Sequence, residues 1–248
     1  HFLDCGIRGF RCDAAYLVPA GVWSQLISFA RFKRNDATFF AETLGCRLDQ
    51  IAALHSAGFD YLFNSAKWWD FRSPWLLEQY NSFRYIAPSV AFPESHDTER
   101  VAADLEREGL HDPVLIERAY RMRYMFTAVF STGVMMPVGF EYGFRGRLDV
   151  VHTRPEHWET PLFDISGYIA EVNRMRAGIP ILNEEGPQNQ IDGGDPAVVC
   201  LLRRAHAGPA WVLSVFNTDL HHGRDARIVS IDDAALAARE VTPGNDGT

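Results

Sequence analysis

Short apolar runs alternate with longer segments of helical period along the first 182 residues of this chain. The runs are continuously apolar, as strands buried on both faces of a parallel sheet are. Their alternation with helical segments predicts β/α units around such a sheet. The five runs are Ile7–Arg11, Thr38–Ala41, Phe59–Phe63, Ser89–Phe92 and Gly133–Val138.

Candidate helices lie between and after these runs. Pro19 stands at a favourable helix start, and Val22, Leu26 and Phe29 follow at helical spacing. In the last candidate, Asp164 is the expected N-cap, and Ile169, Val172 and Met175 are expected to face inward. The other four are Arg47–Ser56, Pro74–Phe83, Pro113–Phe130 and Asp164–Ala177.

The pattern changes after residue 182. Asn183–Asp195 is rich in Gly, Pro, Asn and Gln, which predicts a linker or long loop. Val198–Arg203, Trp211–Asn217 and Ala226–Ile231 then follow as short strands without helices between them. We therefore expect a C-terminal antiparallel β domain over residues 183–248, and leave open whether this domain is truncated. Residues 242–248 are expected to form a frayed tail.

The number of β/α units limits the architecture of residues 1–182. A closed (β/α)8 barrel takes about 250 residues, whereas only five units precede the β domain here. Either the sheet is open, or three units are missing from the front. The acidic residues described next favour the second interpretation, an α/β fold that is the C-terminal part of a TIM barrel.

Composition excludes some classes of function. A net charge of -8 argues against binding to nucleic acid, whose affinity depends on Lys and Arg. No apolar run of about 18 residues is present, which argues against a membrane span. The four cysteines form no CxxC pair and favour reduced thiols, which is typical of a cytoplasmic protein. The chain starts at His1 without a signal-peptide pattern, so the true N-terminus is expected to be missing, and the oligomeric state stays open.

Three acidic residues follow apolar runs, where the functional side chains of a β/α barrel gather. Asp13 ends Gly9–Asp13, Glu42 ends Phe39–Glu42, and Asp97 ends Glu94–Asp97. A single one of them is equally well explained as a helix cap or an ion-pair partner. Three at one barrel mouth favour a shared function.

Glycosidic bond cleavage is the chemistry that these carboxylates suit. Retaining enzymes need a nucleophilic carboxylate and a carboxylic acid about 5–5.5 Å apart, a separation that neighbouring strand ends can provide. Arg11 lies two residues before Asp13 on the same face of its strand and would favour the charged carboxylate. Glu42 follows three apolar residues, which favour the protonated form of a general acid.

These segments resemble those of the α-amylase family, glycoside hydrolase family 13. Gly9–Ala14 is similar to the family's nucleophile segment, Phe40–Glu42 to its acid/base segment, and Phe92–Asp97, with Ser-His-Asp, to its third-carboxylate segment. Their order, with one strand between the second and third, matches the fourth, fifth and seventh barrel strands. Gly139–Glu141 is similar to the loop after the eighth strand.

The resemblance implies a role for each of these residues. Asp13 would form a glycosyl intermediate, Glu42 would be the general acid/base, and Asp97 would bind sugar hydroxyls. Arg11 would orient Asp13, and His96 would bind sugar hydroxyls beside the scissile bond. Tyr16 is the best candidate for stacking on a sugar, although packing against the barrel is the more frequent role of such aromatic residues. The expected partner is an α-glucan or a malto-oligosaccharide.

The chain also departs from the family pattern. It has no Asn-His dipeptide, which the family carries on its third strand; the residues here would then start in the fourth unit and be inactive by themselves. No cofactor is expected from these residues, whereas calcium would be possible in a full-length protein. Tyr16 and Leu17 stand where many amylases have Lys-His. The spacing of Pro19 after Asp13 and the Trp68–Asp70 stretch, with a long segment before the His-Asp motif, look more like bacterial maltosyltransferases that use maltose 1-phosphate.

Three functions therefore stay open. The first is a retaining hydrolase of α-glucosidic linkages that works through a covalent glycosyl-aspartate. The second is an α-glucan transglycosylase or maltosyltransferase with the same intermediate. The third is a non-catalytic, amylase-like domain that binds sugar or serves as a scaffold. A metal-dependent barrel hydrolase is disfavoured, because no His/Asp ligand cluster is found at the other strand ends.

Overall fold

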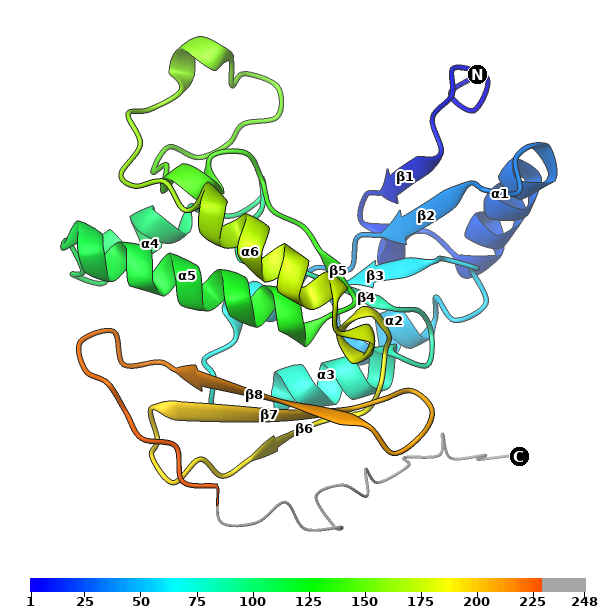
Figure 1. The fold of residues 1–248 in the computed structure, drawn as a ribbon. Helices are drawn as coiled ribbons and strands as arrows, with labels where there is room; N and C mark the ends of the chain where they lie inside the picture. Colours follow the sequence, from blue (N-terminus) through cyan, green and yellow to red (C-terminus); the bar gives the residue numbers. More distant parts are fainter. Residues whose placement is uncertain (229–248) are drawn as a thin grey trace.

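The computed structural model describes residues 1–228, and its larger sheet contains five parallel strands (Figure 1). Each strand pairs with the next one in sequence, so the order in the sheet is that of the chain. All five carboxyl ends consequently lie at the same edge of the sheet. The strands are β1 (Gly9–Cys12), β2 (Thr38–Ala41), β3 (Tyr61–Phe63), β4 (Ser89–Ala91) and β5 (Gly133–Val134).

Helices follow every strand of this sheet, which confirms the predicted α/β organisation. Short 3-10 helices occur at Ala15–Leu17, Ala66–Trp68, Phe140–Tyr142, Pro155–His157 and Pro180–Asn183. The α-helices are α1 (Ala20–Lys33), α2 (Leu48–Ala52), α3 (Trp75–Phe83), α4 (Val101–Arg107), α5 (Pro113–Phe130) and α6 (Ser166–Ala177). α4 was not predicted, because a helix of seven residues is too short to show a clear hydrophobic period.

Apolar side chains project from both faces of the parallel sheet. On one face, Phe39 and Ala41 of β2 are buried in a cluster that includes Ile27 of α1 and Ile51 of α2. On the other face, the ring of Phe40 stacks on a tyrosine of β3 at a centroid distance of 4.9 Å. Burial on both faces explains why the strands read as continuous apolar runs.

Three predicted strands are displaced or clearly shorter in the structure. β1 and β3 each begin two residues later than predicted, and Ile7, before β1, is 41% exposed. β5 has two residues instead of the six predicted, since the ladder ends where Met135 donates to the Ala91 carbonyl. Pro137 lies two residues farther on and has no N–H with which to continue the pairing.

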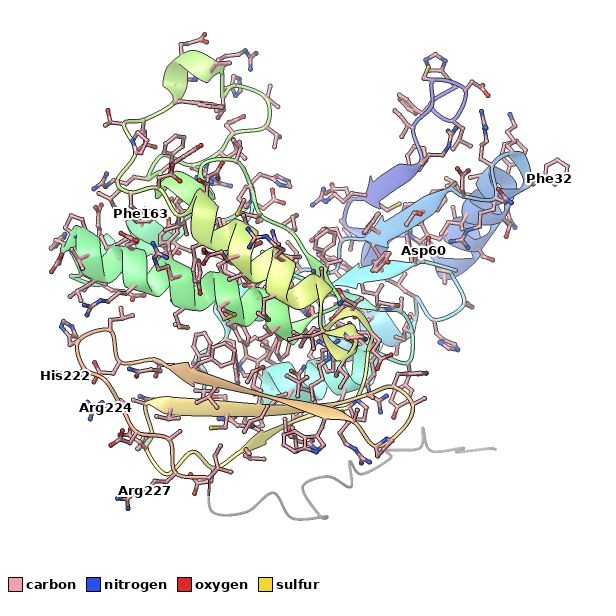
Figure 2. The ribbon with its side chains drawn as sticks, viewed as in Figure 1. Phe32, Asp60, Phe163, His222, Arg224 and Arg227 are labelled. Atoms are coloured by element: carbon pink, nitrogen blue, oxygen red, sulfur yellow. The ribbon has the colours of Figure 1, made fainter. Side chains whose placement is uncertain are left out.

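The periodic apolar residues of α1 do not face the core. The core side of this helix is formed by Ile27 and Ala30, both at least 90% buried. The opposite face is apolar and open to solvent, with Val22 53%, Leu26 48%, Phe29 63% and Phe32 89% exposed. Figure 2 shows Phe32 projecting away from the rest of the protein. Beside α1, β1 has no strand on its outer side among residues 1–228.

The end of the first part also differs in detail from the prediction. Ile169 and Val172 of α6 are buried as expected, but Met175 is 36% exposed and does not face inward. Ile165, rather than Asp164, is the N-cap residue. The carboxylate of Asp164 nevertheless accepts a hydrogen bond from the Ser166 N–H at 2.9 Å, because an acidic side chain can satisfy the free donors of the first turn.

A three-stranded antiparallel sheet follows α6 and lies against α3 and α5 (Figure 1). It consists of β6 (Gln188–Ile191), β7 (Val198–Arg204) and β8 (Trp211–Asn217). β6 lies in the segment that was predicted to be a linker. Its polar side chains give no sequence signal of a strand, although its backbone pairs with β7. The predicted strand Ala226–Ile231 is not a strand at residues 226–228, and the remainder lies outside the described residues, as does the predicted frayed tail. No helix in residues 1–228 combines the length and apolar character needed to cross a membrane.

Candidate active site

A guanidinium group connects two of the three predicted carboxylates. Asp13 follows β1 directly, and Asp97 lies in the loop after β4. Arg11 of β1 reaches both: its Nη1 is 2.5 Å from Asp13 Oδ1, and its Nη2 is 3.5 Å from Asp97 Oδ2. The Asp13 side chain is 80% exposed and the Asp97 side chain 54% exposed, so both are open to a ligand.

The carboxylate of Glu42 is held by two backbone N–H groups, one of them from Ala14, the residue after Asp13. Its Oε2 accepts from the Ala14 N–H at 2.7 Å, and its Oε1 accepts from the Leu44 N–H at 3.1 Å. Ala14 has a φ of 39°, a left-handed conformation that is costly for a residue with a Cβ. This turn directs the N–H that follows Asp13 towards Glu42. With Glu42 only 8% exposed, both of its oxygens are oriented before any substrate binds.

Hydrogen bonds within the loop that carries Asp97 hold it in one conformation. The Ser95 N–H donates to Thr98 Oγ1 at 2.9 Å, and the Asp97 N–H donates to Ser95 Oγ at 3.2 Å. His96 Nε2 lies 3.1 Å from Asp97 Oδ2. The structure thus brings His96 to the same carboxylate that Arg11 contacts.

Tyr16 occupies a less direct position than the other predicted residues. It lies in the 3-10 helix after Asp13 and is partly buried against the core cluster between the sheet and α1. This agrees with the packing alternative, while part of the ring stays accessible. Among the other aromatic residues, Trp69 is 3% exposed and serves the core, whereas Trp68 is 47% exposed and packs edge-on against Phe92.

Two thiols lie next to these carboxylates without being suited to react. Cys12 precedes Asp13, and burial raises the pKa of its thiol. Cys46 donates to the Thr43 carbonyl at 2.9 Å, and burial raises its pKa to about 12. Both thiols are therefore protonated at neutral pH, whereas the thiolate is the nucleophilic form.

Residues beyond the sequence-predicted set also contribute to this region. A cavity of about 280 Å³ lies beside the Asp97 loop, mainly within the connection from β5 to α6. Arg147 lines it and also donates to the Asp97 carbonyl at 3.4 Å. His152 and His157, which have no ligand-like spacing in the sequence, line it as well. No local sequence pattern predicted that these residues line one cavity, because they come together only when the loop folds back on itself.

The described residues contain no group of three or more His, Cys, Asp or Glu side chains arranged to hold a metal ion. The site offers an exposed carboxylate beside a cation, a buried carboxyl oriented by two N–H donors, and a third carboxylate with a histidine. Such a set suits nucleophilic attack coupled to proton transfer.

Comparison with known proteins places this geometry in context. No model of a known protein family matches the chain. Over 227 residues the chain is 34% identical to alpha-1,4-glucan:maltose-1-phosphate maltosyltransferase from Burkholderia pseudomallei (strain K96243). The alignment covers 88% of this chain and 20% of that protein, so the chain spans only a fifth of this relative's length.

Solved structures share the fold. An α-amylase from Geobacillus thermoleovorans, complexed with acarbose, has a TM-score of 0.63 at 17% identity, with 82% of this chain and 47% of that chain covered. The ligand-free cyclic α-maltosyl-(1→6)-maltose hydrolase from Arthrobacter globiformis has a TM-score of 0.61 at 22% identity, with coverages of 87% and 50%. The sequence relative and these folds agree with the family resemblance of the carboxylate segments. The chain is thus similar in sequence to a maltosyltransferase and shares its fold with α-amylase-type enzymes.

Proposed function

We propose that the complete gene product transfers maltosyl units from maltose 1-phosphate to an α-1,4-glucan with retention of configuration. The observation that carries this proposal is the convergence of three carboxylates at one edge of the parallel sheet. Arg11 joins Asp13 to Asp97, and the Ala14 N–H joins the backbone after Asp13 to Glu42.

In the first step, Asp13 attacks the anomeric carbon of the donor sugar while the bond to the leaving oxygen breaks. The phosphate leaving group departs with the electron pair of that bond, and Glu42 transfers its proton to the departing oxygen and is left as a carboxylate. The product is a glycosyl ester of Asp13. In the second step, Glu42 removes the proton from an acceptor hydroxyl, whose oxygen displaces Asp13 and restores the original anomeric configuration.

The surrounding residues have supporting roles in this scheme. Arg11 orients Asp13 and limits the repulsion between Asp13 and Asp97. His96 and Asp97 bind hydroxyl groups of the same sugar and favour its distortion towards the oxocarbenium-like transition state. Tyr16, partly accessible beside Asp13, provides an apolar surface at the edge of the sugar site.

Transfer is favoured over hydrolysis by two observations. The relative that shares 34% identity over most of this chain is a maltosyltransferase. In addition, Tyr16 and Leu17 replace the Lys-His pair that many amylases have near the acceptor sugar. Leu17 is 70% exposed, so it offers an apolar surface where a hydrolase would have polar groups.

We further propose that the five parallel strands form one part of a closed eight-stranded barrel, completed by polypeptide outside residues 1–248. Residues 1–182 would be the barrel part, and residues 183–248 a β domain. The unpaired edge of β1 and the exposed apolar face of α1 support this, because a further β/α unit would cover both. The aligned solved structures also extend to about twice the matched length.

The test is substitution of the proposed acid/base in the complete gene product. Glu42→Gln should lower turnover at least about 100-fold while leaving the fold intact. Glu171→Gln, on the exposed surface of α6, is the matched control and should leave turnover unchanged. Each variant is incubated with maltose 1-phosphate plus glycogen and separately with starch, and released phosphate and chain lengths are measured.

The two incubations separate the possible functions. Phosphate release together with chain extension, lost in Glu42→Gln, supports the transferase. Shortening of starch without phosphate release would instead identify a hydrolase. Sugar binding that survives substitution of the acids, with no product from wild-type protein in either incubation, would identify a non-catalytic sugar-binding domain.

A further inference from the structure

A buried ion pair lies under the loop that carries His96 and Asp97. Glu94 is completely buried and Arg100 is 2% exposed. Arg100 Nη1 is 2.6 Å from Glu94 Oε1, and the other Glu94 oxygen accepts from the Val101 N–H at 2.7 Å. The two residues bracket the loop, so their contact closes its base.

Arg100 also connects this loop to the one after β5. Its Nη2 donates to the Val138 carbonyl at 2.9 Å, and its Nε donates to the Gly146 carbonyl at 3.1 Å. These carbonyls belong to the two ends of a turn that contains the 3-10 helix Phe140–Tyr142. A single guanidinium therefore joins Glu94 and both ends of this turn.

Stability alone gives little reason for such a pair. Removing two charges from water is expensive, and apolar residues of similar volume often serve a folded core equally well. Apolar residues, however, cannot hold neighbouring carbonyl and carboxylate groups in fixed directions through hydrogen bonds. The planar fork of arginine donates along several set directions at once, which neither lysine nor methionine can reproduce.

The Glu94–Arg100 pair closes the base of the loop that carries Asp97, so it influences where Asp97 lies. Inside the bracketed loop, the Asp97 N–H donates to Ser95 Oγ, while Thr98 Oγ1 accepts from the Ser95 N–H and donates to the Ser95 carbonyl. These bonds leave little freedom for Asp97 to move independently. From the opposite side, Arg147 of the β5–α6 connection reaches the Asp97 carbonyl. A shift of Arg100 would consequently displace the Asp97 loop relative to the cavity lining that contains Arg147.

We propose that Glu94 and Arg100 are positioning residues that hold the Asp97 carboxylate in register with the β5–α6 connection and so with the bound sugar. The inference rests on the proposed function, in which Asp97 contacts the sugar. Neither residue touches substrate. Their effect is carried by the loop they close, and a displacement of about 1 Å at a reacting group can lower turnover about 100-fold.

Three variants of the complete gene product test this. Arg100→Lys keeps the charge next to Glu94 but loses the fork. The double variant Glu94→Gln/Arg100→Met removes both charges, so that no unpaired buried charge is left to unfold the protein. The control, Asp60→Asn/Arg31→Met, removes an ion pair of 2.7 Å near the opposite ends of the strands, where Asp60 also accepts from the Phe39 N–H.

Steady-state kinetics with maltose 1-phosphate and glycogen, denaturant unfolding, and hydrogen exchange of the amides in 138–147 are measured on each. We expect kcat to fall about 10- to 100-fold in Arg100→Lys and in the double variant, with KM changed less than threefold and exchange accelerated. The control should keep the wild-type kcat. Folded Arg100→Lys or folded double variant with kcat within threefold of wild type would overturn the proposal.

Failure of the proposed function is recognised separately, because it appears as lack of turnover in the wild-type protein itself. The exchange measurement then decides the positioning role. Faster exchange of 138–147 in Arg100→Lys, without faster exchange in the control, supports the connection between the loops. Unchanged exchange in that variant refutes it.

Discussion

Replacing Arg11 by methionine should separate activity from stability. Arg11 forms ion pairs of 2.5 Å with Asp13 and 3.5 Å with Asp97, but the three side chains are 32%, 80% and 54% exposed. Exposed pairs contribute about 0.2–1 kcal/mol each, so the free energy of unfolding should fall by less than about 2 kcal/mol. Turnover should fall about 100-fold, or about 2.7 kcal/mol of transition-state stabilisation, because two carboxylates lose their common orienting group.

Arg8 offers a matched control. Its ion pair with Asp36 is 3.0 Å long and the side chains are 36% and 61% exposed. Arg8 precedes β1 and Asp36 precedes β2, so the pair lies at the opposite ends of the strands from the carboxylates. Arg8→Met should cost a similar small amount of stability and leave turnover unchanged. Both variants are assayed in the complete gene product by urea unfolding and by phosphate release. A large stability loss in Arg11→Met with wild-type turnover would show that Arg11 is a structural residue.

Two further predictions concern stability. In the complete gene product, Leu26→Lys with Phe29→Lys should lower the free energy of urea unfolding, because a further β/α unit of a closed barrel would cover these exposed side chains; no destabilisation would contradict the closed barrel. Asp70 accepts three hydrogen bonds, chiefly from Ser73, which lower its pKa to about 2 from an ordinary 3.8. Its stabilising contribution is therefore present above about pH 4 and lost as the pH falls towards 2, so Asp70→Asn should flatten the decline in urea stability over that interval, and an unchanged decline would refute this.

Much of the parallel sheet could be predicted because its determinants are local. Strands buried on both faces must be continuously apolar, and four of the five runs overlap their strands closely. Prediction was poorest where backbone pairing outweighs side-chain character. β6 pairs with β7 despite the polar sequence Gln188–Ile191, and β5 stops after Val134 although its apolar run continues.

The candidate site divides in the same way. Asp13, Glu42 and Asp97 could be chosen from sequence because each follows an apolar run, and parallel strands bring their carboxyl ends to one edge. The sequence could not indicate that Arg11 contacts two of these carboxylates, since that depends on the spacing of β1 and β4 across the sheet. The backward turn at Ala14, which orients Glu42, was likewise invisible in the residue types.

The order of the β/α units, the strand ends that carry acids and the family resemblance could be read from the residues alone, because they follow from hydrophobic period and from short contiguous motifs. The buried side of α1, the place of the Glu94–Arg100 pair and the cavity beside the Asp97 loop became apparent only in the folded molecule. These features arise from contacts between residues far apart in the chain. Such contacts depend on how elements pack, and neither spacing nor composition encodes that packing locally.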